Sequence, residues 1–510
     1  MSKPLKKRVE AAEAIAAQWH SIWEECYEYA LPNRTSFYNE DVGQSGMDKV
    51  FDETAIISTQ EFASRLQLGL TPPFMPWMDL QAGSEVGEQG KERLNTALSD
   101  ITKEVFNAID DSNFIQQMHE TFTDLAIGTS VLSIEDGVDG ETLSFLTIPQ
   151  KEVSIEPGRR DDIGGIFRMR SIMAGHLPVE FPTGTFSEGL QKKIEETPQE
   201  KVKLRETNTR DYSRQDTTAW KHECWEEDQF GSTNQPIYTY DYIGPGSFPL
   251  IVSRWSKAAG EVWGRGPLIN ALPSIKTANL VVELTLENAE MAITGMWQGA
   301  DDGVMNPDTV SLVPGTVIPM APNSSGLQPL ETPGRFDVAN LILEDMRANI
   351  KRALYDEMLG PMNQTPMSAT EVVQRVTELQ RRIGSPIGRL TMELLVPIVR
   401  RVLFLLVRKG IIQNVPILDG KSMKAKPVSL LARQQSAEEV NNVVEFLGII
   451  AQTQGPQMVN VITDPIKTAK KVAELKNIDP SIMREEADRE QMLEAMQQQQ
   501  AEPQTASGVM

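Results

Sequence analysis

The chain has 510 residues, of which 40% are hydrophobic and 24% charged, a balance typical of a soluble globular protein with about two to four domains. It contains no uncharged apolar run of about 18 residues, so no helical membrane span is indicated. Cys26 and Cys224 are too few and too distant for a disulfide framework, so we expect a reducing, cytoplasmic setting. The formal net charge of −22 argues against a protein that grips nucleic acid through a broad basic surface, but it fits both an ordinary acidic protein and one that surrounds nucleic acid without adhering to it.

The first third of the chain has the apolar spacing of helices. Helices are predicted at about residues 7–29 and 53–70, each followed by a proline-containing segment that stops it. Two more are predicted over 91–126, separated near Asp111–Asn113, where an N-cap is expected. The N-terminus is basic and then amphipathic, without the apolar block of a signal peptide.

The pattern then changes to the alternation of strands. A hairpin is predicted over 129–149, and "EVSIEP", "GGIFRMRSIM", "WKHECWEED" and "IYTYDYIG" are predicted as further strands. The strongly polar stretch over about 195–216 is expected to be a surface excursion. Residues from about 128 to 254 therefore form a strand-rich insert in a mainly helical protein.

One long helix is predicted from Val262 to Thr294, with an acidic stripe on its surface. Glu283, Glu287 and Glu290 fall on this stripe, and Lys276 lies two turns earlier on the same line. Much of the remaining surface is apolar, namely Leu272, Ile275, Val282, Leu286, Ala289 and Ile293. A solvated helix face is the simplest interpretation of the stripe.

A second long helix is predicted from Asp337 to Leu359, after a segment rich in Gly, Pro and Asp. The two helices would form an antiparallel stalk with a small non-helical head. Arg347, Lys351 and Arg352 give the second helix a basic group, which could pair with the acids of the first helix across the hairpin or between neighbouring subunits.

A very long helix is predicted from Ser368 to Lys409, opened by an S-x-x-E capping pattern and kinked by Gly384, Pro386 and Pro397. It is basic, which suggests contact with acidic neighbouring surfaces or nucleic acid, with packing between subunits favoured. Helices resume at about Ser436, and the Gln-rich end of the chain is expected to be flexible.

Motifs for chemistry are weak. His222 and Cys224 share a strand face but lack the further ligands that zinc needs. "GEVWGRGPL" lacks the spacing of a phosphate-binding loop, and its glycines are better explained by a sharp turn into a helix. The adjacent carboxylates could bind a divalent metal, although loop solvation or helix capping explains them more simply; they are Asp110–Asp111, Asp161–Asp162 and Asp301–Asp302. We therefore expect no enzyme, no metal and no cofactor.

The order of the segments resembles the portal, or head-to-tail connector, proteins of short-tailed, T7-like bacteriophages. The stretches that carry the resemblance are "ECYEYALPNRTSFYN", "FASRLQLGLTPPFMPWMDL", "VWGRGPLINALPSIKTANLVVE" and "MSATEVVQRVTELQRRIGSPIGRLTMELLVPIVRRVL". They are spread over residues 11–490 in the order found in that family.

The resemblance implies a mainly α fold with an α+β wing, assembled as a ring that is usually of twelve copies. Carried over, it implies a wing over 1–264 (with the strand-rich insert at 128–254), a first stem helix over 265–294, a clip over 295–336, a second stem helix over 337–359, a tunnel loop over 360–367, a long kinked wing helix and wing return over 368–430, a helical crown over 431–490 and a flexible tail over 491–510.

The implied role is a portal at one capsid vertex, through which DNA is packaged and ejected. The channel-facing candidates are Lys276, Glu283, Glu287, Glu290, Arg347, Lys351 and Arg352; the tunnel-loop candidates are Met362, Asn363, Gln364 and Thr365; the docking candidates in the clip are Asp301, Asp302, Asn306 and Asp308.

The implied partners are further copies of the chain, double-stranded DNA, a large terminase, major capsid and scaffolding proteins, and tail adaptor or nozzle proteins, with no membrane. The protein would be made in the host bacterial cytoplasm and end in the virion. The alternative is a soluble helical scaffold or adaptor of a viral assembly without a DNA channel.

Overall fold

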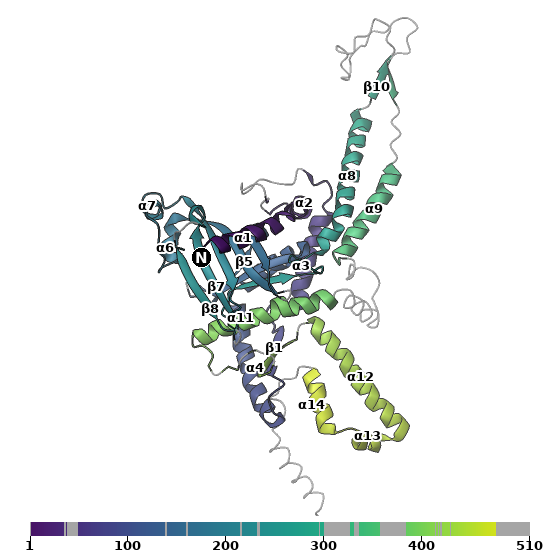
Figure 1. The fold of residues 1–510 in the computed structure, drawn as a ribbon. Coiled ribbons are helices and arrows are strands. Elements are labelled where there is room, and N and C mark those ends of the chain that lie inside the picture. The colour runs from purple at the N-terminus through teal and green to yellow at the C-terminus, as the bar shows by residue number, and fades with distance from the viewer. Residues whose placement is uncertain are drawn as a thin grey trace, which may run out of the picture. The chain divides into compact units, whose positions relative to one another are not determined.

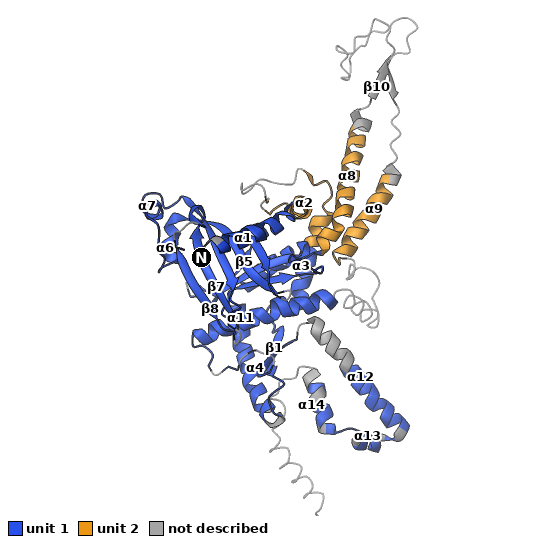
Figure 2. Ribbon diagram, viewed as in Figure 1, with its two compact units in different colours: residues 1–21, 60–266, 363–510 blue, residues 22–59, 267–362 orange. Residues whose placement is uncertain are grey.

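The computed structural model describes residues 2–34, 37, 49–137, 140–159, 162–214, 217–231, 235–294, 296–299, 327–330, 336–356, 384–413, 415–416, 418, 421–428 and 430–475 (Figure 1). The chain divides into two compact units. Figure 2 colours unit 1, residues 1–21, 60–266 and 363–510, in blue and unit 2, residues 22–59 and 267–362, in orange.

The helices predicted in the first third are confirmed, with one added break. Instead of a single helix over 7–29, the chain forms α1 (Ser2–Ala17) and α2 (His20–Ala30). Then follow α3 (Thr54–Leu70), α4 (Glu88–Asp110) and α5 (Phe114–Ile127). The predicted break before α5 is present, because the Ser112 hydroxyl accepts the backbone N–H of Phe114 at 3.2 Å.

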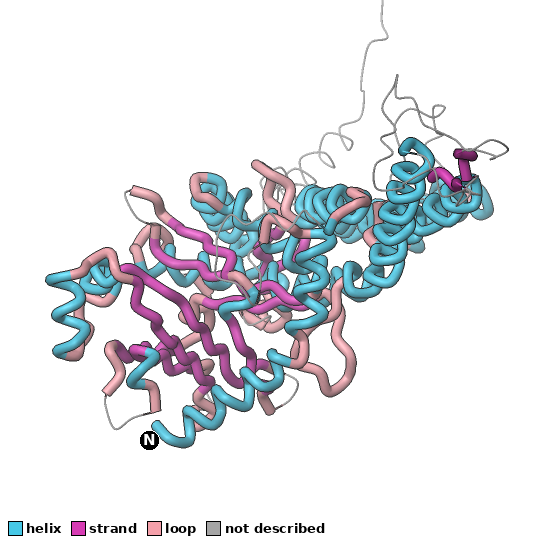
Figure 3. The backbone as a smooth tube through the Cα atoms, turned by 90° about the horizontal axis from the view of Figure 1, so that it is seen from above, coloured by secondary structure: helices cyan, strands magenta, loops and turns pink. Residues whose placement is uncertain are grey.

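The strand-rich insert is confirmed as two antiparallel sheets in unit 1. One has the order β4-β5-β6-β7-β8 and the other β3-β2-β9. Their bounds are β2 Thr129–Asp136, β3 Leu143–Ile148, β4 Val153–Pro157, β5 Ile163–Met173, β6 Lys201–Arg210, β7 Ala219–Glu226, β8 Tyr238–Ile243 and β9 Leu250–Arg254. Figure 3 shows these strands in magenta, with α1 starting at the marked N-terminus and running along them.

The expected surface excursion over 195–216 is wrong for residues 201–210, which form β6, the middle strand of the five-stranded sheet. The charged side chains Arg205 and Glu206 of this strand are buried and paired. Glu206 accepts from Arg170 at 2.7 Å, and Arg205 donates to Glu227 at 2.5 and 2.7 Å. Paired charges can occupy the interior of a sheet, where an apolar alternation is normally expected.

Two small parts of unit 1 had no counterpart in the sequence analysis. α6 (Leu177–Glu180) and α7 (Glu188–Glu196) cover an apolar cluster that includes Leu204 and Cys224. After α3, β1 (Met78–Ala82) pairs with β12 (Met423–Pro427), joining segments far apart in the sequence.

The long helix is described from residue 384 and carries a π-helical turn at Thr391–Leu395 before α11 (Val396–Arg408). Val396 N–H donates to the carbonyl of Thr391, five residues back. Pro397 has no N–H to donate, and its ring would clash with the carbonyl four residues earlier, so a widened turn relieves both problems. A π-helical turn therefore lies just before Pro397, one of the three positions where a kink was predicted.

The described basic residues of this helix contact the same chain, and the expected packing between subunits stays a prediction. The buried Arg401 donates to the carbonyls of Ile134, Gly246 and Ser247. Arg408 pairs with Asp136. These bonds tie α11 to β2 and to the segment between β8 and β9.

The C-terminal helices of unit 1 are α12 (Leu430–Gln454), α13 (Pro456–Ile462) and α14 (Pro465–Leu475), with α13 and α14 both packed on α12. Helix α12 begins six residues before the predicted start at Ser436. The tail over 491–510 lies outside the described residues.

Unit 2 contains two long helices that pack on each other, α8 (Pro267–Thr294) and α9 (Phe336–Ala353), with a short hairpin of β10 (Met296–Gly299) and β11 (Leu327–Leu330). We refer to α8 and α9 as the stalk. Two predicted limits were wrong: the first helix starts at Pro267 rather than Val262, and the second ends at Ala353 rather than Leu359. Tyr355 has a φ of 60°, and this left-handed residue stops the helix.

Candidate functional site

The stalk is the candidate site, and its first helix has a buried face of helical period. The buried residues of α8 recur every three or four positions, namely Leu268, Ala271, Leu272, Ile275, Ala278 and Asn279. On α9, Ile350 is buried, and Leu354 is buried just after the helix ends. The predicted apolar positions are confirmed at Leu272 and Ile275, whereas Leu286 is 55% exposed.

The acidic stripe lies beside the buried face. Glu287 and Glu290 are exposed and Glu283 is half-buried. At about 100° per residue, these three carboxylates span about 60° of the helix surface and lie on average about 85° from the centre of the buried face. Leu280 and Leu284, which are 52% and 48% exposed, lie about 75° further round the helix. One helix thus carries three adjacent faces: buried, acidic and exposed apolar.

Two of the basic candidates pair with acids outside this stripe. Lys276 Nζ lies 2.8 Å from Glu25 Oε1 of α2. The Arg347 guanidinium pairs with Asp52. Lys351 and Arg352 are exposed near the end of α9, where the positive charge faces the negative end of the helix dipole.

Asp52 and Asn279 organise the base of the stalk, and neither residue was predicted from the sequence. Asn279 Oδ1 accepts the backbone N–H groups of Phe51 and Asp52 at 2.8 and 3.1 Å, and its Nδ2 donates to the carbonyl of Ile275. Asn279 could have been identified from the sequence, because it is a polar residue on the apolar face of α8. Its amide fixes the segment before α3 to the first stalk helix.

The remaining predicted site residues lie outside the described residues, so the structure says nothing of them. These are the clip candidates Asp301, Asp302, Asn306 and Asp308, and the tunnel-loop candidates Met362, Asn363, Gln364 and Thr365.

Two of the three glycines of "GEVWGRGPL", Gly264 and Gly266, serve close backbone packing and not phosphate binding. A Cβ on Gly264 would lie 2.2 Å from the carbonyl oxygen of Gly128, and one on Gly266 would lie 2.0 Å from that of Ala126. The amides are also occupied, since Gly264 N donates to Thr129 Oγ1 at 2.8 Å and Gly266 N to the Ile127 carbonyl at 2.7 Å. The interpretation as a sharp turn into a helix is therefore confirmed.

The other chemical candidates have structural roles. His222 Nδ1 lies 2.8 Å from Asn208 Oδ1 inside the sheet, and burial lowers the pKa of His222 and raises that of the Cys224 thiol. Asp162 pairs with Arg210 at 2.5 Å. Burial, with Asp111 beside it, raises the pKa of Asp110. Within the described part of the chain, no three metal-ligating side chains gather in one place.

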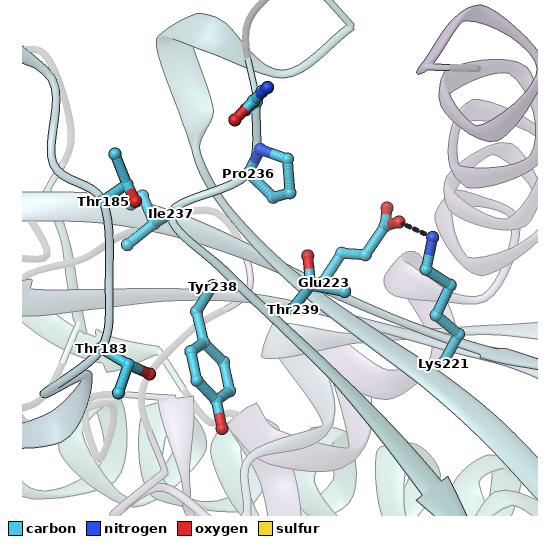
Figure 4. Close-up of a pocket in the computed structure, with 9 residues that line it drawn as sticks. Thr183, Thr185, Lys221, Glu223, Pro236, Ile237, Tyr238 and Thr239 are labelled. Atoms are coloured by element: carbon cyan, nitrogen blue, oxygen red, sulfur yellow. Dashed lines mark ion pairs between the residues drawn. The ribbon is translucent and has the colours of Figure 1, made fainter.

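A shallow hollow of about 440 Å³ lies on the five-stranded sheet (Figure 4). It is lined by Thr183, Thr185, Lys221, Glu223, Gln235, Pro236, Ile237, Tyr238 and Thr239. Lys221 and Glu223 form an ion pair of 2.5 Å across it, drawn as a dashed line in Figure 4. The hollow holds no nucleophile and base in contact, so it is a surface feature rather than a catalytic site.

None of the helices that the structure describes has the length and hydropathy to cross a bilayer.

Comparison with known proteins gives a match along almost the whole chain. A family model described as "Bacteriophage head to tail connecting protein" matches residues 2–483. A "Probable portal protein" of Bordetella phage BPP-1 is 24% identical over 495 residues, covering 91% of this chain and 85% of that protein. The "Portal protein" of Salmonella phage epsilon15 is 22% identical, with 94% and 88% covered, and the "Portal protein" of Enterobacteria phage T3 is 20% identical, with 88% and 83% covered.

Solved structures give weaker matches. A chain from "Neck of empty GTA particle computed with C6 symmetry" is 10% identical, with a TM-score of 0.38 and 79% of this chain and 88% of that chain covered. One from "Virion of native gene transfer agent (GTA) particle" is also 10% identical, with a TM-score of 0.36 and 78% and 87% covered.

Proposed function

The chain belongs to the bacteriophage head-to-tail connecting proteins, and on this premise we propose that copies of it form a ring, with twelve as the expected number, around a channel for DNA at one capsid vertex. A member of this family is a structural component of the phage and not an enzyme. The observation that carries the proposal is the arrangement of three adjacent faces on α8.

A neighbouring copy would cover the exposed apolar face of α8. Leu280 and Leu284 lie on the side of α8 roughly opposite its buried face, so they are available to a second stalk. On α9, Leu341 and Ile342 are 64% and 41% exposed. Contact between Leu280–Leu284 of one copy and Leu341–Ile342 of the next would join two different patches, and repeated contacts of this kind close a ring.

The same logic applies to α12. Phe446 and Ile449, 53% and 52% exposed, lie on one flank of its buried stripe, and Val444, 57% exposed, lies on the other. A helix with apolar residues on both flanks can pack between two neighbours. This supports a ring in which α12 to α14 form the crown, together with the rest of residues 431–490.

The acidic face would remain open to the channel. Once α9 covers one side of α8 and a neighbouring stalk covers the other, Glu283, Glu287 and Glu290 lie between the two contacts. Carboxylates that face phosphates repel them, so DNA would slide rather than bind. The ring would act as a passive conduit, with ATP hydrolysis supplied by a separate terminase.

The remaining parts of the chain receive roles by analogy with the family. Residues 295–336 would be the clip, on which a large terminase and later the tail adaptor and nozzle proteins dock. Residues 360–367 would project into the channel as a tunnel loop. Residues 1–264 and 368–430 would form the wing, where capsid and scaffolding proteins make contact. The protein would be made in the cytoplasm of the bacterial host and end at a vertex of the virion.

The first experiment is to measure the mass and shape of the purified protein. Twelve copies of 56.8 kDa weigh about 680 kDa, and light scattering should give this mass while negative-stain end views show a ring with a hole wide enough for duplex DNA. A Leu280→Asp, Leu284→Asp variant should lower the mass, whereas Glu104→Gln on the exposed side of α4 should not. A compact assembly without a hole would instead favour a scaffold or adaptor.

A further inference from the structure

The five-stranded sheet has one protected edge and one open edge. At the β4 edge, α1 packs on the strand and Arg8 pairs with Glu156 at 2.6 Å. At the other edge is β8; the Thr185 N–H donates to the Ile237 carbonyl directly before this strand at 2.8 Å, and among the described residues no strand pairs with the outer side of β8 itself. Thr239, Tyr240, Asp241 and Ile243 are all exposed there.

The backbone register identifies the groups that face this edge. Gly244 N–H donates to the Thr218 carbonyl at 2.9 Å, and Trp220 and His222 lie opposite Tyr242 and Tyr240. Hydrogen-bonded pairs recur every second residue in an antiparallel ladder. The even-numbered residues of β8 therefore bond to β7, and the N–H and C=O groups of Thr239, Asp241 and Ile243 point away from the sheet.

The sequence of β8 favours pairing at this edge. Soluble proteins usually blunt an open edge with lysine, proline, a bulge or a covering segment. β8 reads "YTYDYI", in which every residue except Asp241 has a high strand propensity. Its only charged residue is Asp241, which lies opposite Lys221 of β7. Because Lys221 is paired with Glu223, these three side chains together carry one net negative charge, which a cation on an added strand would neutralise.

We propose that the outer edge of β8 binds an extended segment of another protein, which adds to the sheet as an antiparallel strand with a lysine or arginine opposite Asp241. Residues directly opposite one another share a face of the sheet. The residue opposite Thr239 therefore points to the face of the hollow in Figure 4, whose walls include Thr183, Thr185 and Thr239. A small polar or β-branched side chain suits that position.

The other face of the added strand would be apolar. Tyr240 and Tyr242 lie on this face, with their ring centroids 4.7 Å apart, and Tyr240 is 45% exposed. Read from its N-terminus, the partner segment therefore has an apolar residue opposite Ile243, an apolar one beside Tyr242, a basic one opposite Asp241, an apolar one beside Tyr240 and a polar one opposite Thr239.

A second copy of this chain is a poorer occupant. If two β8 edges pair antiparallel about their centre, the two Asp241 carboxylates stand opposite each other, and like charges at that position destabilise a sheet. Such a pair is also two-fold symmetric, so it would join two assemblies rather than extend around one ring.

The test uses the assembled full-length protein and two short synthetic peptides that follow this pattern, one with the core Val-Val-Lys-Val-Thr and one with glutamate in place of the lysine. The lysine peptide should slow hydrogen exchange in residues 238–243, and the glutamate peptide should bind severalfold more weakly. Asp241→Lys should reverse this preference. Thr239→Pro removes an outward N–H without touching the ladder to β7, and it should weaken both peptides about tenfold, whereas Thr239→Val should leave the binding intact.

The mass of the assembly is measured for each variant. It distinguishes a variant that loses only peptide binding at the β8 edge from one that no longer forms the ring. Equal binding of both peptides to the wild type and to Asp241→Lys would overturn the proposal, as would the absence of slowed exchange in the wild type. A third outcome would assign the edge to a second copy: whole rings associate, Thr239→Pro abolishes that association, and the lysine peptide is not preferred.

Discussion

Arg347 of α9 donates from Nε to Asp52 Oδ2 at 2.8 Å, its terminal nitrogen lies 2.7 Å from the same oxygen in an ion pair, and the Asp52 side chain is 1% exposed. The pair links the second stalk helix to the residues just before α3. Asn279 holds the same residues to the first stalk helix, so two polar contacts define the base of the stalk.

Arg347→Ala should lower the free energy of unfolding by about 1–3 kcal/mol, because it leaves a buried carboxylate without its cation. Denaturant unfolding measures this loss. Lys351→Ala, one turn further along α9 and exposed, is the matched control and should cost less than about 0.5 kcal/mol. If Arg347→Ala lowers the free energy of unfolding no more in the wild type than in an Asp52→Asn background, the pair does not stabilise the stalk.

The same carboxylate should make stability depend on acid pH. Burial alone would raise the pKa of Asp52, but hydrogen bonds from Thr54 and Arg347 outweigh it and lower the pKa below the ordinary 3.8. The stabilisation is therefore complete above the unfolded pKa and is lost as the pH falls through the lower, folded value. The difference in unfolding free energy between the wild type and Asp52→Asn should narrow as the pH falls below 3.8; a constant difference would contradict this assignment.

Gly264→Ala should destabilise unit 1 by about 3 kcal/mol or more, because the added Cβ meets the Gly128 carbonyl at 2.2 Å. Gly189→Ala is the control: Gly189 lies in α7 with no atom within 4 Å of the added Cβ, and the change should be neutral or stabilise by about 0.5–1 kcal/mol. Thermal unfolding of both variants measures the difference. Equal melting temperatures would mean that the backbone contact at Gly128 relaxes freely.

Replacing Glu283, Glu287 and Glu290 together by lysine should convert a ring that does not retain duplex DNA into one that does. Retention should fall steeply as salt rises, because each phosphate contact releases counterions. Filter retention of linear DNA across a salt series measures this. The control replaces Glu104, Glu188 and Glu195, exposed on the body of unit 1, by lysine; equal retention by both triple variants would exclude a luminal stripe.

Sequence periodicity predicted the long elements well, because burial against one side gives helices and strands a regular apolar pattern. It failed at β6, whose interior positions Arg205 and Glu206 are buried through partners on other elements. Those partners are set by the fold, and a local pattern cannot reveal them. For the same reason the stalk acids were identified, but their relation to Leu280 and Leu284 emerged only once the buried face of α8 was known.

The start of α8 illustrates a different limit. The helix was predicted to start at Val262, but the structure begins it at Pro267. Gly264 and Gly266 instead pack closely against residues 126–128, which lie more than a hundred positions earlier in the sequence. The glycines signalled a turn, and the residue at which the helix begins depended on that distant contact.

The π-helical turn at Thr391–Leu395 makes this helix more tolerant of substitution than of deletion. Met392 within the turn is 69% exposed, so most side chains can replace it. Removing any one residue of the turn would restore α-helical hydrogen bonding, but it would rotate the preceding helix by about 100° and shift it by about 1.5 Å relative to α11. Glu393, which accepts Arg254 at 2.7 Å, would lose its alignment with β9. In related chains, we therefore expect the number of residues between Arg389 and Pro397 to vary less than their identities.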